Sequence, residues 1–272
     1  MGFYLRLSAF ICGFKYLMTI YYEQSGHGPD VVLVHGWGSH GGVWTEIARD
    51  LSKDFCVTVP DLPGHGRSRD FAPDAFTPEI MAEQIQHRLS GPAVWIGWSM
   101  GGLVALAAAQ QLSRAVSGFV LVNATPKYVQ SPDWPHAMPP SVLAQFAQNL
   151  EQDYVGTLER FLTLQMAVGE DRAVLRRLRD EMFRYGEPVT AALHAGLRLL
   201  KEEDRRDTLG DIAVPALVIQ GERDRLVPMG AARFLAEHLP QARLAPVPGA
   251  GHAPFLSHPA EFLERLKGFI HG

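Results

Sequence analysis

The sequence predicts an α/β fold in which a mainly parallel central sheet has helices on both faces and carries an inserted block of helices. Two observations support this prediction. Short, continuously apolar runs typical of buried strands alternate with helical patterns, and glycine-containing turns follow the ends of those runs. Between residues 127 and 206 the apolar runs stop and only helical patterns remain, which indicates an insertion.

Length and composition favour a soluble globular protein with a sizeable core. The 272 residues suffice for one large α/β domain with an insertion, or for two small domains, and 47% of them are hydrophobic. A formal net charge of −4 carries no signature of nucleic-acid binding. The two cysteines, Cys12 and Cys56, predict no disulfide framework and favour a reducing, cytoplasmic compartment. No metal-ligand spacing occurs, so we expect neither a metal nor a cofactor.

Residues 1–17 are apolar, but they do not fit a membrane anchor or a signal peptide. Arg6 and Lys15 interrupt the run, it is too short to span a bilayer, and no A-x-A-like cleavage site follows. We expect an upstream-start or cloning extension outside the fold, with a membrane-surface segment as the alternative and no stable membrane association. The core is then expected to comprise residues 18–126 and 207–272, and a helical lid residues 127–206.

A nucleophile elbow is predicted at the sequence Gly-Trp-Ser-Met-Gly, residues 97–101. An apolar run at residues 93–96 precedes it and an Ala-rich helical run at residues 103–112 follows it. In such a strand–turn–helix the serine is held in a strained conformation, and its neighbours must be glycines because the flanking backbones nearly touch. The turn would present Ser99 above a helix N-terminus, where developing negative charge is favoured.

The sequence His-Gly-Trp-Gly, residues 35–38, stands at the end of an early predicted strand. We expect residues 19–23 and 30–35 to form a hairpin, so this glycine-containing stretch would follow its second strand. An oxyanion loop needs a backbone N–H that points inward with no bulky residue in its way. The backbone N–H groups of Trp37 and Met100 are therefore the predicted oxyanion donors.

Several acidic residues and histidines compete to complete the site. Asp61 and His65 lie in an Asp-Leu-Pro-Gly-His stretch that is better explained as turn chemistry. Asn123, at the end of the strand predicted over residues 118–122, cannot carry the charge that some hydrolases place there. Two carboxylates follow the strand at residues 215–220, Glu222 and Asp224, and we favour Asp224.

A histidine follows the last predicted strand on a glycine-rich loop. His252 comes third in the chain order Ser, Asp, His, which is the order of α/β-hydrolases. His258 competes with it, but His258-Pro259 is better interpreted as the start of the final helix. The sequence thus predicts an α/β-hydrolase core with the triad Ser99, Asp224 and His252. A serine nucleophile argues against haloalkane dehalogenase or epoxide hydrolase chemistry, in which a carboxylate must form the ester.

The predicted lid consists of helices at residues 141–150, 154–168, 171–185 and 189–200. Between residues 160 and 184 it carries six arginines against four acids. This surplus fits either a solvated helix face with i,i+4 ion pairs or a docking surface for an acidic partner.

Six stretches resemble one family closely: HGWG (35–38), DLPGHGRS (61–68), GWSMGGLVA (97–105), ERFLTLQ (159–165), RDRLVP (223–228) and HAPFLSHPAEF (252–262). The chain is similar over residues 18–272 to pimeloyl-acyl-carrier-protein methyl ester esterases of biotin synthesis. The resemblance implies hydrolysis of a pimeloyl methyl ester carried by acyl carrier protein, by a monomer without cofactors. A broad carboxylesterase or a C–C bond hydrolase for free small molecules is the alternative; a non-enzymatic binding protein on this fold is disfavoured because all three triad residue types stand in order.

The resemblance also implies the residues that contact the substrate. The acyl channel would be lined by Trp37, Ser99, Met100, Phe161, Leu162, Thr163, Leu164, Gln165 and His252. The carrier protein would dock on Arg160, Arg172, Arg176 and Arg177. A further basic position of the family falls on Gly156 here, which weakens the predicted docking surface.

Overall fold

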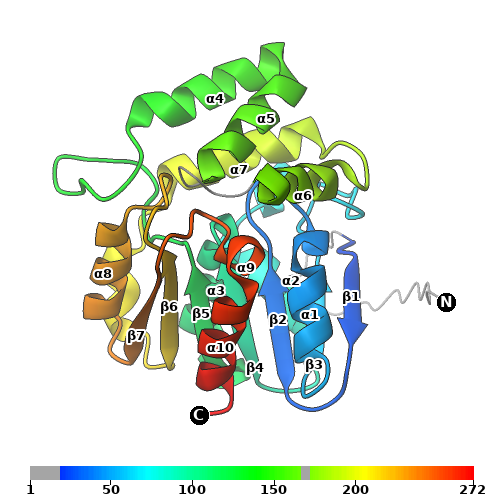
Figure 1. The fold of residues 1–272 in the computed structure, drawn as a ribbon, viewed down its shortest axis with the longest axis vertical. Helices are drawn as coiled ribbons and strands as arrows, with labels where there is room; N and C mark the ends of the chain where they lie inside the picture. Colours follow the sequence, from blue (N-terminus) through cyan, green and yellow to red (C-terminus); the bar gives the residue numbers. More distant parts are fainter. Residues whose placement is uncertain (1–18, 167–171) are drawn as a thin grey trace.

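The computed structural model of the protein describes residues 19–166 and 172–272 (Figure 1). The predicted extension at residues 1–17 lies outside the described residues. A seven-stranded sheet has the order β1-β3-β2-β4-β5-β6-β7, and every pairing except that of β1 with β3 is parallel. The strands are β1 (Tyr22–Ser25), β2 (Asp30–Val34), β3 (Cys56–Pro60), β4 (Ala93–Trp98), β5 (Val116–Val122), β6 (Ala216–Gly221) and β7 (Ala242–Val247).

The predicted hairpin of the first two strands is wrong. β1 pairs antiparallel with β3, with Tyr22 opposite Pro60, and β3 in turn pairs in parallel with β2. The chain between β1 and β2 crosses the end of β3, where Cys56 donates its backbone N–H to Pro29 at 3.0 Å. β3 therefore occupies the place beside β2 that a hairpin would have given to β1.

Helices cover both faces of the sheet and exclude water from its central strands. β2 is buried along its whole length, and so is α3 from Met100 to Ala109, which explains why neither segment shows amphipathic alternation. In Figure 1, α1 and α10 lie in front of the sheet and α2 and α3 behind it. The core helices are α1 (Thr45–Leu51), α2 (Pro78–Gln86), α3 (Met100–Gln111), α8 (Met229–His238), α9 (Pro254–Ser257) and α10 (Pro259–Ile270); short 3-10 turns are η1 (Gly41–Trp44), η2 (Pro73–Ala75), η3 (Ser113–Ala115) and η4 (Arg206–Asp211).

Between β5 and β6, four helices form a cap that we call the insertion. Figure 1 shows it above the sheet, at the ends toward which the parallel strands point. The hydrogen bonds that join it to the core include one from Trp37 Nε1 to Leu193 O at 2.9 Å and one from Val189 N to Gly64 O at 2.7 Å. Its helices are α4 (Pro140–Gln152), α5 (Tyr154–Gln165), α6 (Arg172–Phe183) and α7 (Thr190–Glu202). Among the helices that the structure describes, none is both long and apolar enough to cross a membrane.

Candidate active site

The turn between β4 and α3 has the strained geometry that the sequence predicts. Ser99 has φ 53° and ψ −122°, outside the regions that most residues adopt. A Cβ on Gly97 would lie 2.2 Å from Gly101 O, and one on Gly101 would lie 2.5 Å from Val34 O. Both positions therefore require glycine, and the turn places Ser99 at the carboxyl end of β4, at the first turn of α3.

The predicted acid, Asp224, lies within ion-pair distance of the predicted histidine, His252. Asp224 lies in the turn after β6 and His252 in the loop after β7, and His252 Nδ1 lies 2.8 Å from Asp224 Oδ2. Both side chains are buried. A carboxylate at Nδ1 fixes the tautomer in which Nε2 can accept a proton. His252 Nε2 has no hydrogen-bond partner among the described residues, so it is available to a reacting group.

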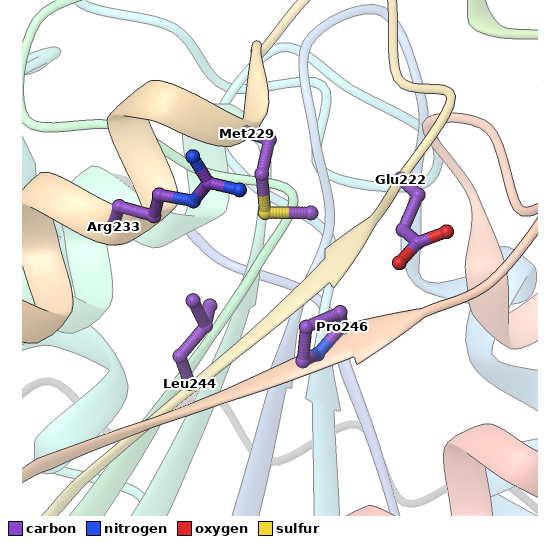
Figure 2. A pocket seen from close by; sticks show the side chains of 5 residues that line it. All are labelled: Glu222, Met229, Arg233, Leu244 and Pro246. Atoms are coloured by element: carbon purple, nitrogen blue, oxygen red, sulfur yellow. The ribbon is translucent and has the colours of Figure 1, made fainter.

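The other carboxylate that the sequence left open, Glu222, lies elsewhere. It is exposed, and its side chain is one of those that line a cavity of about 460 Å³ beside β6, β7 and α8. Figure 2 shows these side chains. The side chains around it include Met229, Arg233, Leu244 and Pro246, none of which was predicted to take part in catalysis.

Two hydrogen bonds to the backbone of His252 fix its loop to the neighbouring segments. Trp98, the residue before Ser99, donates its indole N–H to His252 O at 2.7 Å, and the two rings lie 5.6 Å apart. On the other side, His252 N donates to Gln165 O at the end of α5, at 2.8 Å. The loop is therefore attached both to the strand that carries Ser99 and to the insertion.

The predicted oxyanion loop runs along the serine. A Cβ on Gly36 would lie 3.1 Å from Ser99 Cβ, so the backbone before Trp37 passes directly beside the nucleophile position. Met100 follows Ser99 at the start of α3, and the side chains of Trp37 and Met100 both border Gly196 of α7. This arrangement brings the two predicted donor residues to the same place, beneath the insertion.

The run at residues 161–165 divides between two faces of α5. Phe161 and Leu162 are buried, and the Phe161 ring meets the Trp37 ring edge-on at 4.8 Å. Gln165 is also buried, and its Oε1 has no partner among the described residues. Thr163 is exposed and its hydroxyl donates to Glu159 O, so it lies on the outer face; the prediction that it lines the channel is not supported by its position. Leu164 is half-buried.

The four predicted docking arginines differ in their surroundings. Arg177 of α6 pairs with Glu46 of α1 at 2.8 Å and so joins the insertion to the core. Arg160 lies 3.4 Å from Asp153 on the same helix surface, with both side chains largely exposed. The remaining two are exposed and form no ion pair with any described residue: Arg172 and Arg176.

Two buried polar residues at the site were missed or dismissed by the sequence interpretation. The Tyr128 hydroxyl lies beside the Ser99 side chain and the Thr125 backbone, without a hydrogen bond of normal geometry to described residues. Burial raises the pKa of this phenol, so the hydroxyl remains protonated at ordinary pH. Asn123 donates to Asp224 Oδ2. No motif marks Tyr128, whereas the position of Asn123 at a strand end was a usable signal.

Asp61 and His65 belong to a separate structural network, as their turn sequence predicts. Asp61 accepts hydrogen bonds from the backbone of Gly41 at 2.7 Å and from Arg67 Nε at 2.7 Å. Burial raises the pKa of Asp61, but the bonds from Arg67 outweigh that effect, and the net shift is downward. His65 Nδ1 contacts Pro63 O at 3.0 Å. Within residues 19–166 and 172–272, no cluster of potential metal ligands occurs.

Comparison with known proteins places this site in a family. The alpha/beta hydrolase fold family matches residues 29–259, so the chain belongs to the α/β hydrolases, as predicted. Its fold is similar to that of an esterase from Exiguobacterium antarcticum (TM-score 0.86, 24% identity, covering 93% of this chain and 96% of that one). It is also similar to a bromoperoxidase from Bacillus anthracis (TM-score 0.84, 24% identity, 93% and 95%). At this identity the two structures support the fold alone.

Relatives with similar sequences identify the family of esterases within the α/β hydrolases to which the chain belongs. The chain is 45% identical over 248 residues to the pimeloyl-[acyl-carrier protein] methyl ester esterase of Nitrosomonas europaea, covering 91% of this chain and 98% of that protein. It is 44% identical over 246 residues to the protein of that name from Xanthomonas axonopodis pv. citri (90% and 96%). It is 42% identical over 250 residues to that of Chromobacterium violaceum (92% and 97%). The chain belongs to this family of esterases, and the resemblance seen in its motifs is confirmed.

Proposed function

We propose that this chain hydrolyses the methyl ester of pimeloyl-acyl carrier protein and releases methanol and the free carboxylate, a step of biotin synthesis. The observation that carries the proposal is the buried His252–Asp224 pair, whose loop Trp98 ties to the strained turn that holds Ser99. The names of the relatives supply the substrate, and the geometry supplies groups for its chemistry.

In the first half of the proposed reaction, Ser99 Oγ attacks the ester carbonyl carbon and its proton passes to His252 Nε2. The backbone N–H groups of Trp37 and Met100 donate to the oxyanion of the tetrahedral intermediate. When the intermediate collapses, the bond from carbon to the methoxy oxygen breaks. His252 returns the proton to that oxygen, and methanol leaves.

In the second half, a water molecule replaces the serine as nucleophile. His252 takes a proton from the water, the hydroxide attacks the acyl-enzyme carbonyl, and the proton then passes to Ser99 Oγ as the acyl bond breaks. Asp224 holds the imidazole in one orientation throughout and stabilises its protonated form. The product leaves as the carboxylic acid, which releases its proton to the solvent and becomes the carboxylate, and the enzyme returns to its starting state.

The side chains around the site suit an acyl chain. Trp37, Phe161 and Leu162 offer an apolar wall, and burial of each methylene of the substrate against it contributes about 0.8 kcal/mol. Gln165 supplies a buried acceptor without a partner among the described residues at the end of α5. Thr163 is left out of this wall because it is exposed.

We place the carrier protein on the insertion, over Arg160, Arg172, Arg176 and Arg177. Acyl carrier proteins are acidic, and exposed arginines attract such a partner mainly by speeding the encounter. Arg172 and Arg176 are the strongest candidates, since no described carboxylate neutralises them. Arg177 is engaged with Glu46 and Arg160 with Asp153, so these two are expected to contribute less.

The activity is tested by complementation of a biotin-requiring strain that lacks this esterase. The wild-type gene should restore growth without biotin, and Ser99→Ala should not. With purified protein, Ser99→Ala should lose at least about 10⁴-fold in kcat on pimeloyl methyl ester bound to carrier protein. Hydrolysis of p-nitrophenyl esters without turnover of the carrier-bound ester would favour the alternative, a broad carboxylesterase.

The docking surface is tested by reversing the charges of Arg172 and Arg176 to Glu. We expect kcat/KM for the carrier-bound ester to fall about 10-fold or more at low ionic strength, and turnover of p-nitrophenyl acetate to stay unchanged. Arg114→Glu is the matched control, because Arg114 is exposed in η3, at the opposite ends of the strands. Equal effects of the control and the double reversal would remove this surface from the proposal.

A further inference from the structure

Asn123 ends β5 in a conformation that few residues adopt. Its φ is 47°, and among the described residues only Ser99 shares a positive φ without being glycine. The two lie on neighbouring strand ends. Ser99 N donates to Val122 O at 3.0 Å, and Asn123 N donates to Ile219 O at 2.9 Å, so each strained residue still continues the sheet into the next strand. Asparagine tolerates the left-handed region better than most residues, which explains how the position can be occupied.

The buried side chain of Asn123 joins three segments that form the site. Its Nδ2 donates to Asp224 Oδ2 at 2.5 Å and to Gly251 O at 3.1 Å. Its Oδ1 accepts the backbone N–H of Gly221 at 3.2 Å. One amide thus contacts the end of β6, the turn that carries the acid and the residue before His252.

Asn123 contacts the same oxygen of Asp224, Oδ2, that pairs with His252. Oδ1 of this carboxylate accepts the backbone N–H groups of Leu226 at 2.8 Å and Val227 at 3.1 Å. Oδ2 accepts from His252 Nδ1, from Asn123 and, at the longer distance of 3.3 Å, from Gln220 Nε2. Asn123 therefore provides the shortest of the contacts that set where Oδ2 lies relative to the imidazole.

We infer that Asn123 is a positioning residue of the active site, which acts through Asp224 and the His252 loop and does not touch the substrate. This inference rests on the proposed roles of Ser99, Asp224 and His252. A rival explanation is that asparagine is present only because the backbone needs a left-handed conformation. The two explanations differ in what the amide group contributes, so variants that keep the backbone and change the amide separate them.

The first variant is Asn123→Gly, which permits positive φ and removes the side chain. We expect kcat for p-nitrophenyl butyrate to fall about 10- to 100-fold with KM within about twofold, because the acid and the histidine are displaced from their productive geometry. Asn149→Gly is the control: Asn149 lies in α4 of the insertion, where glycine weakens the helix without touching the site. An Asn123→Gly enzyme with wild-type kcat would overturn the inference.

The second variant is Asn123→Asp, which keeps the shape and makes the donor depend on pH. Two carboxyl groups in such close contact share a proton, so the new acid still donates to Asp224 at low pH and loses that proton as the pH rises. The ratio of Asn123→Asp to wild-type kcat should therefore fall steadily with increasing pH. A ratio that is constant or rises with pH would contradict a role of the amide as donor.

A third measurement does not depend on turnover. The His252 Nδ1 proton should give a downfield NMR signal, assigned by its loss in His252→Gln, and this signal should shift or broaden in Asn123→Gly and not in Asn149→Gly. An unchanged signal in Asn123→Gly would refute the positioning role. An inactive wild-type enzyme with the expected signal change would instead count against the proposed function alone.

Discussion

The indole N–H of Trp98 donates to the carbonyl oxygen of His252 at a distance of 2.7 Å, so the residue before the nucleophile holds the loop of the proposed base. The two residues are 154 positions apart in the sequence. Both are buried, and no water replaces a lost partner easily at such a position. The bond fixes where the imidazole lies relative to Ser99, because Trp98 and Ser99 are adjacent on the same turn.

Trp98→Phe removes this bond and keeps an aromatic ring. We expect kcat to fall about 10-fold with little change in KM, because the histidine loop then loses its bond to the strand that carries Ser99. The unsatisfied carbonyl should also lower stability by about 1–3 kcal/mol. The measurement is steady-state hydrolysis of a p-nitrophenyl ester together with thermal unfolding.

Trp95→Phe provides the matched control for that change. Trp95 is buried on the same strand, but its indole nitrogen has no hydrogen-bond partner among the described residues. It should lose stability through reduced packing and keep its kcat. If both variants lost kcat equally, packing of β4 and not the bond to His252 would explain the effect.

Tyr128→Phe tests the buried hydroxyl beside Ser99. Because the phenol has no hydrogen bond of normal geometry to described residues, its removal should leave the midpoint of thermal unfolding unchanged or slightly raised. We expect the rate of Ser99 labelling by a fluorophosphonate to fall several-fold, since a protonated hydroxyl beside the nucleophile can donate to it. Labelling at the wild-type rate would show that Tyr128 only fills space.

Two buried histidines predict that the protein loses stability in mild acid. Burial lowers the pKa of His35 to about 3 and that of His65 to about 4, each from an ordinary value of 6.5. The unprotonated Nε2 of His35 also accepts the Leu62 backbone N–H at 2.8 Å, a bond that the protonated ring could not accept. Asp61 acts in the opposite direction on both, but burial dominates.

The protein loses stability in acid because the unfolded chain binds more protons than the folded protein. Below about pH 6.5 the unfolded chain binds protons that the folded protein excludes, so stability is fully present above that pH and falls as the pH decreases toward 4. At about pH 5.5 each histidine lowers the free energy of unfolding by about 1.4 kcal/mol. Proton uptake on thermal unfolding through these two histidines should therefore rise from near zero at about pH 7.5 to roughly two protons at about pH 5, and His65→Gln should remove about one of them. Unfolding without proton uptake in this range would contradict the prediction.

The sequence predicted which residues meet at the candidate site better than it predicted the contacts among them. The glycines around Ser99 could be recognised in the sequence because they depend on the local geometry of the turn. The positions of Asp224 and His252 could be recognised because each directly follows a predicted strand. The partner of β1 could not be recognised, because hydrophobic pattern predicts that a strand exists and not which strand lies beside it. Thr163 was included with its neighbours although successive helical residues are 100° apart, so five in a row cannot share one face. The contact of Asn123 with Asp224 joins residues 101 positions apart and required coordinates.

Gln165→Leu should change the stability of the protein and its kinetics in opposite directions. The Gln165 side chain is buried with Oε1 unpartnered among the described residues, whereas its backbone oxygen accepts the His252 N–H, a bond that the substitution retains. Replacing an unsatisfied polar group by an apolar one of similar size should raise stability by about 1–3 kcal/mol, or roughly 2–4 °C per kcal/mol in the midpoint of thermal unfolding. Because Oε1 is the acceptor proposed to serve the substrate, KM for the carrier-bound ester should also rise several-fold while turnover of p-nitrophenyl acetate stays near wild type. Thr163→Val, on the exposed face of the same helix, should change neither quantity, and a variant of Gln165 that was less stable but kinetically normal would show that the amide is structural.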